Sequence, residues 1–256
     1  MISGIMISEL GDSENSDRIG GCATVPDGWA LGDRKEVAFF PTHQPEDNGL
    51  APWYRDGQII GYSRKVELPN NVWLMLHGNG GQASDRTYAI PCFSTEDSVF
   101  IMEYPGYGAR KELPSKEAFN RAAQDAYLFL RETYPKLPVC VVGESIGTGP
   151  AAFLATLDRP PEKLVLIVPF DKLSRVATEH FPSFLVRLIL KDDWDNAEAL
   201  SKFKGPVDIF GAETDSVIPV SHAKALASTL PASKLRLIDG GHNDWSFHNR
   251  VTIRNP

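Results

Sequence analysis

A serine flanked by glycines lies at residues 143–147, which read Gly-Glu-Ser-Ile-Gly. This segment directly follows an apolar run, residues 139–142, and precedes an Ala-rich segment, residues 148–157, that is typical of a helix. A tight turn from a strand into a helix needs glycines, because larger side chains would collide there, and it exposes the central hydroxyl. The pattern therefore predicts that Ser145 is a nucleophile.

A serine hydroxyl is a weak nucleophile, so a base must take its proton and a third group must orient that base. The chain supplies both in order, because Asp215 follows the apolar run 207–210 and His242 follows the run 235–238. In a parallel sheet the carboxyl ends of the strands meet at one edge, where such residues can converge. The sequence predicts that His242 is the base and Asp215 the acid. Surface or capping roles suffice for the other histidines, which are His43, His180, His222 and His248.

Two backbone N–H groups are expected to bind the oxygen that becomes negative during acyl transfer. One belongs to Ile146, at the start of the predicted helix, whose N-terminus adds positive potential. The other is expected from Asn79 or Gly80, because residues 76–81 read Leu-His-Gly-Asn-Gly-Gly after an apolar run. The same segment lacks the glycine spacing and the lysine of phosphate-binding loops, so no nucleotide is expected there. The proposed chemistry needs no cofactor.

Short apolar runs alternate along the chain with longer amphipathic segments. Most of the runs are uninterrupted, as in strands that helices cover on both faces, so an α/β fold with a mostly parallel sheet is predicted. One helical face is expected between residues 119 and 130 and consists of Phe119, Ala122, Ala123, Ala126, Tyr127 and Leu130. The candidate strands are residues 37–40, 59–66, 72–76, 99–102, 139–142, 164–168, 207–210 and 235–238.

The 256 residues, 42% of them hydrophobic, suffice for the core of one domain. Residues 1–34 show no sustained period, which predicts a loose N-terminal arm, and residues 35–256 are expected to form a single domain. The long insertion at about residues 171–204 has its own helical stripe and predicts a small helical cap. Phe184 and Leu188 in this stripe are candidate contacts for an acyl chain, but docking of the cap onto the core explains the stripe as well.

The formal net charge is −7, which repels phosphate backbones and anionic headgroups, so nucleic acid is not an expected partner. The three cysteines, Cys22, Cys92 and Cys140, lack the paired spacing of zinc sites and disulfide frameworks, which predicts no metal and fits a reducing cytoplasm. No apolar run approaches the roughly 18 residues that span a bilayer, so no stable membrane anchor is expected. The composition leaves the oligomeric state open.

Together these motifs resemble the α/β-hydrolase superfamily over about residues 36–246. His-Gly-Asn-Gly at residues 77–80, Tyr-Pro-Gly-Tyr-Gly at residues 104–108 and the glycine-flanked serine fall in the order of that family, ahead of the acid and the histidine. The chain looks like its compact, small-cap members, which include bacterial esterases and acyl-protein thioesterases. The resemblance implies an eight-stranded sheet whose second strand is antiparallel, with helices on both faces.

The resemblance leaves a choice of acid, because some members of this fold place it after the sixth strand, where Asp171 stands. Asp215 is favoured, since residues 214–219 form a short loop between a strand and a helix, whereas Asp171 opens the cap.

The leading hypothesis is a serine hydrolase that cleaves a small carboxylic ester or thioester through an acyl-enzyme. A peptidase or amidase would use the same triad and is the alternative. A non-catalytic binding module of the same fold would lack a triad residue, and a halide-removing enzyme would need an aspartate in place of Ser145.

Overall fold

A computed structural model gives the structure of residues 39–43, 49–183, 186, 190 and 192–255. The predicted N-terminal arm, residues 1–34, lies outside the described residues. The candidate acyl contacts Phe184 and Leu188 also lie outside them. The division into an arm and one domain, and the role of these two side chains, therefore stay predictions.

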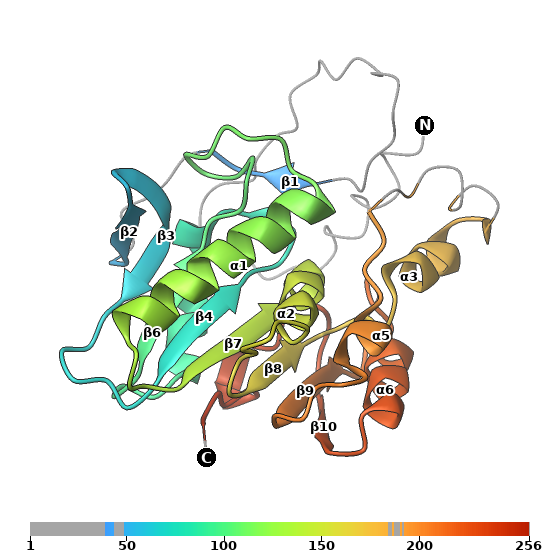
Figure 1. Cartoon of the computed structure of the whole chain (residues 1–256). Helices are drawn as coiled ribbons and strands as arrows, with labels where there is room; N and C mark the ends of the chain where they lie inside the picture. The colour runs from blue at the N-terminus through green and yellow to red at the C-terminus, as the bar shows by residue number, and fades with distance from the viewer. Residues whose placement is uncertain (1–38, 44–48, 184–185, 187–189, 191, 256) are drawn as a thin grey trace. The chain divides into compact units, whose positions relative to one another are not determined.

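An eight-stranded sheet lies at the centre of the described residues (Figure 1). Neighbouring strands run parallel from β10 to β6, whereas β3 runs antiparallel to both of its neighbours, β6 and β2. This arrangement confirms the predicted mostly parallel sheet with an antiparallel second strand. In sheet order the strands are β10 (Ser233–Ile238), β9 (Val207–Ala212), β8 (Leu164–Ile167), β7 (Val139–Glu144), β4 (Val72–Leu76), β6 (Ser98–Met102), β3 (Gln58–Arg64) and β2 (Ala51–Arg55).

The beginning of the described chain differs from the sequence prediction. The edge strand β2 was not predicted, because Pro52 interrupts its strand pattern, and only an edge strand tolerates a proline readily. Of the predicted first strand, residues 37–40, the described part contributes Phe40 to the short strand β1 (Phe40–Pro41). This strand pairs with β5 (Gly80–Gly81) and not with the main sheet.

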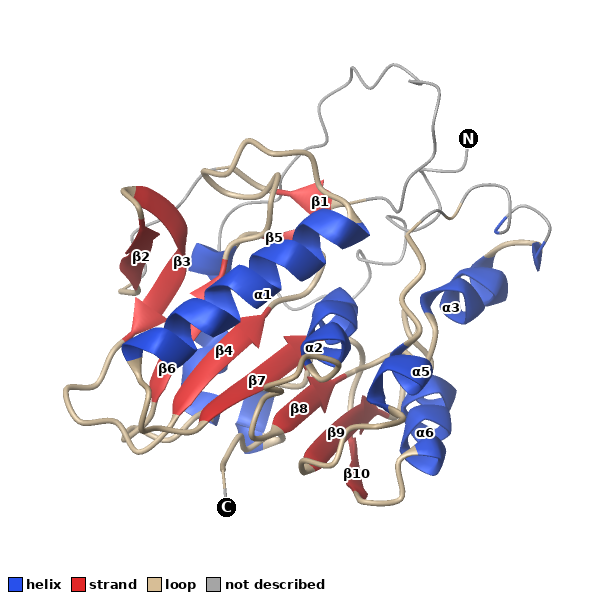
Figure 2. Ribbon diagram, viewed as in Figure 1, coloured by secondary structure: helices blue, strands red, loops and turns tan. Residues whose placement is uncertain are grey.

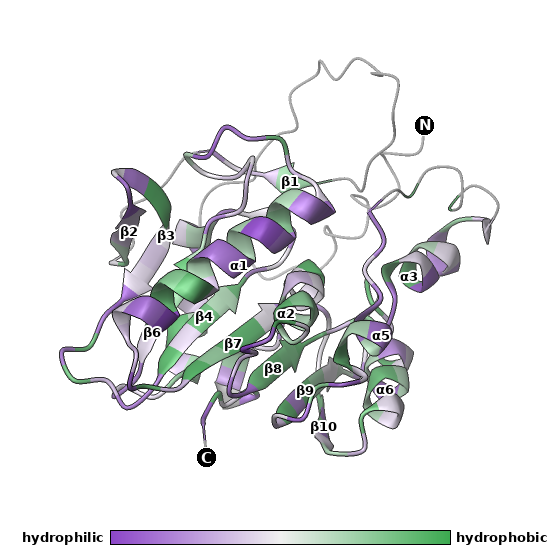
Figure 3. Ribbon diagram, in the orientation of Figure 1, coloured by the Kyte–Doolittle hydropathy of each residue, from purple (hydrophilic) through white to green (hydrophobic). Residues whose placement is uncertain are grey.

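The parallel strands bury side chains alternately in two apolar layers. Helices lie on both faces of the sheet (Figure 2), and the central strands are largely hydrophobic (Figure 3). Leu74 of β4 contributes to the layer beneath α1, α2 and α6, whereas its neighbour Met75 contributes to the layer beneath η1 and the C-terminal segment. Helices therefore cover both faces, as predicted. The helices of the described residues are η1 (Ala83–Cys92), α1 (Lys116–Thr133), η2 (Ser145–Gly147), α2 (Thr148–Leu154), α3 (Leu173–His180), α5 (Asn196–Leu200), α6 (Val220–Thr229) and η3 (Phe247–Asn249).

Helix α1 shows the predicted amphipathic pattern. It begins after Ser115, whose side chain accepts a hydrogen bond from the Ala118 N–H at 3.1 Å. Its buried residues include all six members of the predicted stripe. Among the described helices none is both long and apolar enough to cross a membrane.

The insertion at residues 171–204 contributes to the body of the domain as well as to the predicted cap. Its described helices are α3 and α5. The Asn196 amide of α5 donates to the Thr148 hydroxyl at 3.1 Å and to the Phe170 carbonyl at 2.9 Å. Leu200 of α5 is fully buried in the layer that also contains α2. Helix α5 therefore packs as part of the core. Of the described helices in the insertion, only α3 can belong to the predicted cap.

Replacing Phe119 by alanine should destabilise the domain strongly. The Phe119 ring is fully buried and stacks on Tyr104, with ring centroids 4.0 Å apart and planes 4° apart. We expect the free energy of unfolding to fall by about 3–5 kcal/mol, because the truncation leaves a cavity. Chemical denaturation measures the loss. Leu128→Ala is the matched control on the same helix, because Leu128 is 39% exposed, and it should change the stability by about 0.5 kcal/mol or less. Equal losses in the two variants would contradict this account.

Candidate active site

Ser145 lies at the tight turn between β7 and α2. Its φ of +52° is in the left-handed region, which a residue with a side chain adopts only when its surroundings enforce it. A Cβ on Gly143 would lie 2.7 Å from the Gly147 carbonyl oxygen, and a Cβ on Gly147 would overlap the carbonyl of Leu76. The two glycines therefore allow the turn to close against the end of β4, as the sequence pattern predicts.

The structure brings Ser145, His242 and Asp215 together in one hydrogen-bonded chain. His242 Nε2 lies 2.8 Å from Ser145 Oγ, and His242 Nδ1 lies 2.7 Å from Asp215 Oδ2. The second carboxylate oxygen, Asp215 Oδ1, accepts the N–H groups of Val217 and Ile218, each at 2.8 Å. The Asp215 carboxylate is almost fully buried, whereas the His242 side chain is 12% exposed. The acid is thus held from both sides, and the imidazole faces both the serine and the solvent.

Asp171 makes a different contact from the one that the alternative acid would need. Its Oδ1 lies 2.7 Å from His222 Nδ1, and its Oδ2 pairs with Arg175. His222 Nε2 lies 3.1 Å from the Glu179 carboxylate, so carboxylates contact both nitrogens of this ring. The prediction of a surface or capping role for His222 is wrong, because this residue of α6 has a fully buried side chain that contacts Asp171 and Glu179.

The two candidate oxyanion donors belong to the serine turn itself and to a neighbouring loop. Ile146 follows the serine in η2 and is buried. Asn79 lies in the loop between β4 and β5, where the Tyr107 hydroxyl is 2.8 Å from its Oδ1 and 2.9 Å from its carbonyl oxygen. The same loop contacts the serine turn directly, because a Cβ on Gly147 would lie 2.8 Å from the His77 carbonyl oxygen. The structure therefore brings the segment that carries Asn79 next to the serine turn.

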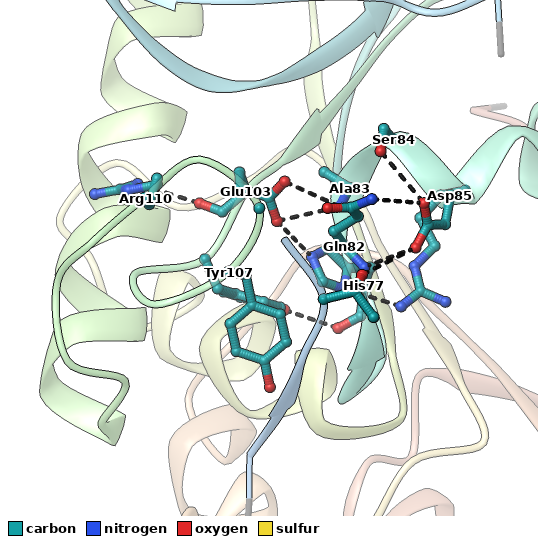
Figure 4. Close-up of polar contacts among 12 residues, drawn as sticks. His77, Gln82, Ala83, Ser84, Asp85, Glu103, Tyr107 and Arg110 are labelled. Carbon is teal, nitrogen blue, oxygen red and sulfur yellow. Dashed lines mark hydrogen bonds and ion pairs between the residues drawn. The ribbon is translucent and has the colours of Figure 1, made fainter. Parts of the chain in front are cut away.

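Polar residues of the segment after β6 contact this loop and the residues that follow it (Figure 4). The Glu103 carboxylate accepts the Ala83 N–H at 3.1 Å and lies 3.6 Å from His77 Nε2. The Tyr104 hydroxyl donates to the His77 carbonyl at 2.9 Å. Arg110 donates to the backbone carbonyl of Glu103 at 3.1 Å. Sequence reasoning missed Glu103, although a carboxylate directly after the apolar run 99–102 was a signal for it.

Among the described residues, no group of three or more histidine, cysteine, aspartate or glutamate side chains could hold a metal ion. The described cysteines, Cys92 and Cys140, are free and buried. Burial raises the pKa of Cys92 to about 11 and that of Cys140 to about 12, so both thiols remain protonated near neutral pH. Neither described thiol is therefore available as a thiolate nucleophile.

Comparisons with known proteins place the chain among hydrolases. No protein-family model matches the sequence. Human alpha/beta hydrolase domain-containing protein 17B is 32% identical over 195 residues, which cover 73% of this chain and 66% of that protein. The solved structure of the Pyrococcus furiosus esterase Pf2001 superimposes with a TM-score of 0.59 at 14% identity and covers 82% of this chain and 91% of that one. The chain belongs to the α/β-hydrolase superfamily.

Other relatives of this α/β hydrolase are longer than the matched region. Uncharacterized protein Rv2307c of Mycobacterium tuberculosis is 31% identical, and the match covers 67% of this chain and 62% of that protein. The zebrafish lysophosphatidylserine lipase ABHD12 is 29% identical, with 68% and 50% covered. The chain thus spans about half to two thirds of the length of these relatives.

The two candidate acids of this α/β hydrolase should differ sharply in their effect on turnover. Asp215→Asn keeps the shape of the side chain but no longer stabilises the imidazolium form of His242, so kcat should fall by about 10³ to 10⁴. Asp171→Asn should reduce kcat less than about tenfold, because this carboxylate contacts His222 and not His242. Steady-state measurement of kcat for both folded variants shows which of the two aspartates acts as the acid. The reverse ranking would assign the acid to Asp171.

Proposed function

We propose that this chain is a carboxylic-ester hydrolase that works through an acyl-enzyme on Ser145. The observation that supports it is the continuous chain from Ser145 Oγ through His242 to Asp215, with distances of 2.8 and 2.7 Å. These contacts provide a nucleophile, a base in contact with it and an acid that orients the base.

In the proposed acylation step, Ser145 Oγ attacks the ester carbonyl carbon while His242 Nε2 takes its proton. Asp215 stabilises the resulting imidazolium, and the carbonyl oxygen becomes an anion that the N–H groups of Ile146 and Asn79 bind. The tetrahedral species collapses, and His242 protonates the departing alcohol or thiol. Water, deprotonated by His242, then releases the acid and restores the serine.

The expected substrate is a small-molecule ester, with thioesters as a related class. One relative is named a lysophosphatidylserine lipase and one structural neighbour an esterase, which supports ester chemistry over amide chemistry. The negative net charge supports a partner other than nucleic acid. A cytoplasmic location is part of the proposal. It is supported by the cysteines, whose spacing is not that of a disulfide framework.

The protein should hydrolyse p-nitrophenyl esters of some acyl length faster than any member of a peptide panel. Ser145→Ala should lower ester turnover by at least about 10³-fold, because the nucleophile is lost. A fluorophosphonate probe should label the protein once, at Ser145, as mass spectrometry can show. Ser228→Ala is the matched control, since Ser228 is an exposed serine on α6, and it should label and turn over like the wild type. Labelling of Ser145→Ala, or faster cleavage of peptides, would contradict the proposal.

A further inference from the structure

The residue before the nucleophile is a buried carboxylate that the proposed proton transfers do not use. Glu144 ends β7 and is 6% exposed. Its Oε2 accepts the Gly78 N–H at 3.0 Å, and its Oε1 accepts the Tyr88 hydroxyl at 3.0 Å and the Trp245 Nε1–H at 3.1 Å. Three donors from three separate segments thus meet on one side chain.

Each of these segments belongs to the active site or supports it. Gly78 directly precedes Asn79 in the loop that carries the candidate oxyanion donor, and Trp245 lies three residues after His242. Tyr88 lies in η1 and reaches the site through its hydroxyl, which contacts Glu144. Glu144 itself adjoins Ser145. One carboxylate therefore connects the serine turn, the loop at residues 77–82 (the oxyanion loop) and the loop at residues 242–247 (the histidine loop).

Arg86 holds the same oxyanion loop through its carbonyl groups. Its guanidinium donates to the Tyr88 hydroxyl at 2.9 Å, lies 3.4 Å from the Gly78 carbonyl and contacts the Gly80 carbonyl. Arg86 is buried like Glu144, so the two charges offset each other's cost of leaving water.

Burial alone would raise the pKa of Glu144, but Arg86 and the hydrogen bonds from Trp245 and Gly78 hold it below its usual value. The carboxylate therefore stays ionised at neutral pH and can accept all three hydrogen bonds. The positive charge of Arg86 also offsets the repulsion that the Glu144 carboxylate would exert on an oxyanion formed at Ser145.

We propose that Glu144 and Arg86 are positioning residues that fix the oxyanion loop and the histidine loop relative to Ser145. The proposal rests on the ester hydrolysis proposed above, because the loop matters for catalysis only if an oxyanion forms at this site. Neither side chain is expected to touch the substrate; both act through the backbone of the loops that do.

Glu144→Gln tests this role without changing the size of the side chain. The Gly78 N–H and the Trp245 Nε1–H are donors only, whereas the Tyr88 hydroxyl can turn round and accept. Because Gly78 and Trp245 contact different oxygens of Glu144, the NH₂ group of glutamine must face one of these donors. The variant should therefore release one of the two loops.

Three measurements follow the release of a loop. Hydrogen–deuterium exchange followed by mass spectrometry should be faster in residues 77–82 or 242–247 of Glu144→Gln than in the wild type. It should be unchanged in strands that do not contact these two loops. For esters, kcat should fall by on the order of tenfold to 100-fold while KM stays within about threefold, because the donors act mainly on the transition state. A trifluoromethyl ketone, which mimics the tetrahedral oxyanion, should lose affinity in parallel with kcat/KM.

Glu162→Gln is the matched control, because the Glu162 carboxylate contacts the opposite end of β7. The Glu162 carboxylate accepts the Val139 N–H at 2.9 Å and pairs with Arg131 at 2.5 Å. Its loss should lower the melting temperature but leave kcat and the exchange of both loops unchanged. Tyr88→Phe is the milder second variant, since it removes one donor from Glu144, and it should move kcat in the same direction by a smaller factor.

The outcomes separate this proposal from the proposed function. A folded Glu144→Gln variant with wild-type exchange in both loops overturns the proposal, and so does faster exchange with wild-type kcat. A kcat loss in Glu162→Gln as large as that in Glu144→Gln also overturns it, because a general loss of stability would then explain both. If the wild type neither hydrolyses esters nor reacts with the phosphonate, the proposed function fails, and loop exchange in Glu144→Gln still decides whether the carboxylate fixes the loops.

Discussion

The contact between Gly147 and the carbonyl end of β4 is the constraint on which the rest of the site depends. A Cβ at this position would overlap the Leu76 carbonyl, so only glycine allows the serine turn to lie directly against the neighbouring strand. Strand β4 pairs with β7 in parallel register, with Leu76 opposite Gly143, so both strands end at the same level. The segment after β4 is therefore held beside the serine, as the proposed oxyanion hole requires.

A close approach of backbones leaves polar groups that must be satisfied away from water. Buried ionic side chains provide the partners, since Glu144 accepts the Gly78 N–H, Glu103 accepts the Ala83 N–H and Arg86 donates to the Gly80 carbonyl. Burying each of these charges costs free energy, which pairing offsets only when the geometry is good. The expected gain is a loop with a single conformation, because each backbone group has one partner in a fixed place.

Sequence reasoning anticipated what depends on local pattern and chain order. The central strands are continuous apolar runs, and Ser145, Asp215 and His242 follow strand ends, so their convergence follows from the parallel sheet itself. The contacts of Glu144 could not be anticipated, because Gly78 lies 66 positions before it and Trp245 lies 101 positions after it. Strand β2 was missed for a local reason. Pro52 interrupts its strand pattern, and a proline in such a run is more typical of a loop than of a strand.

The two aspartate–histidine pairs show why chemistry alone does not identify the acid. Asp215 and Asp171 each lie 2.7 Å from the Nδ1 atom of a histidine, so the two pairs are equivalent in that contact. They differ at the other ring nitrogen, which meets Ser145 Oγ in His242 but the Glu179 carboxylate in His222. A base needs a free lone pair directed at its proton donor, and a ring with a carboxylate on each side directs none at a serine. The difference comes from topology, because the turn after β7 places a hydroxyl beside one imidazole, whereas α3 places a carboxylate beside the other.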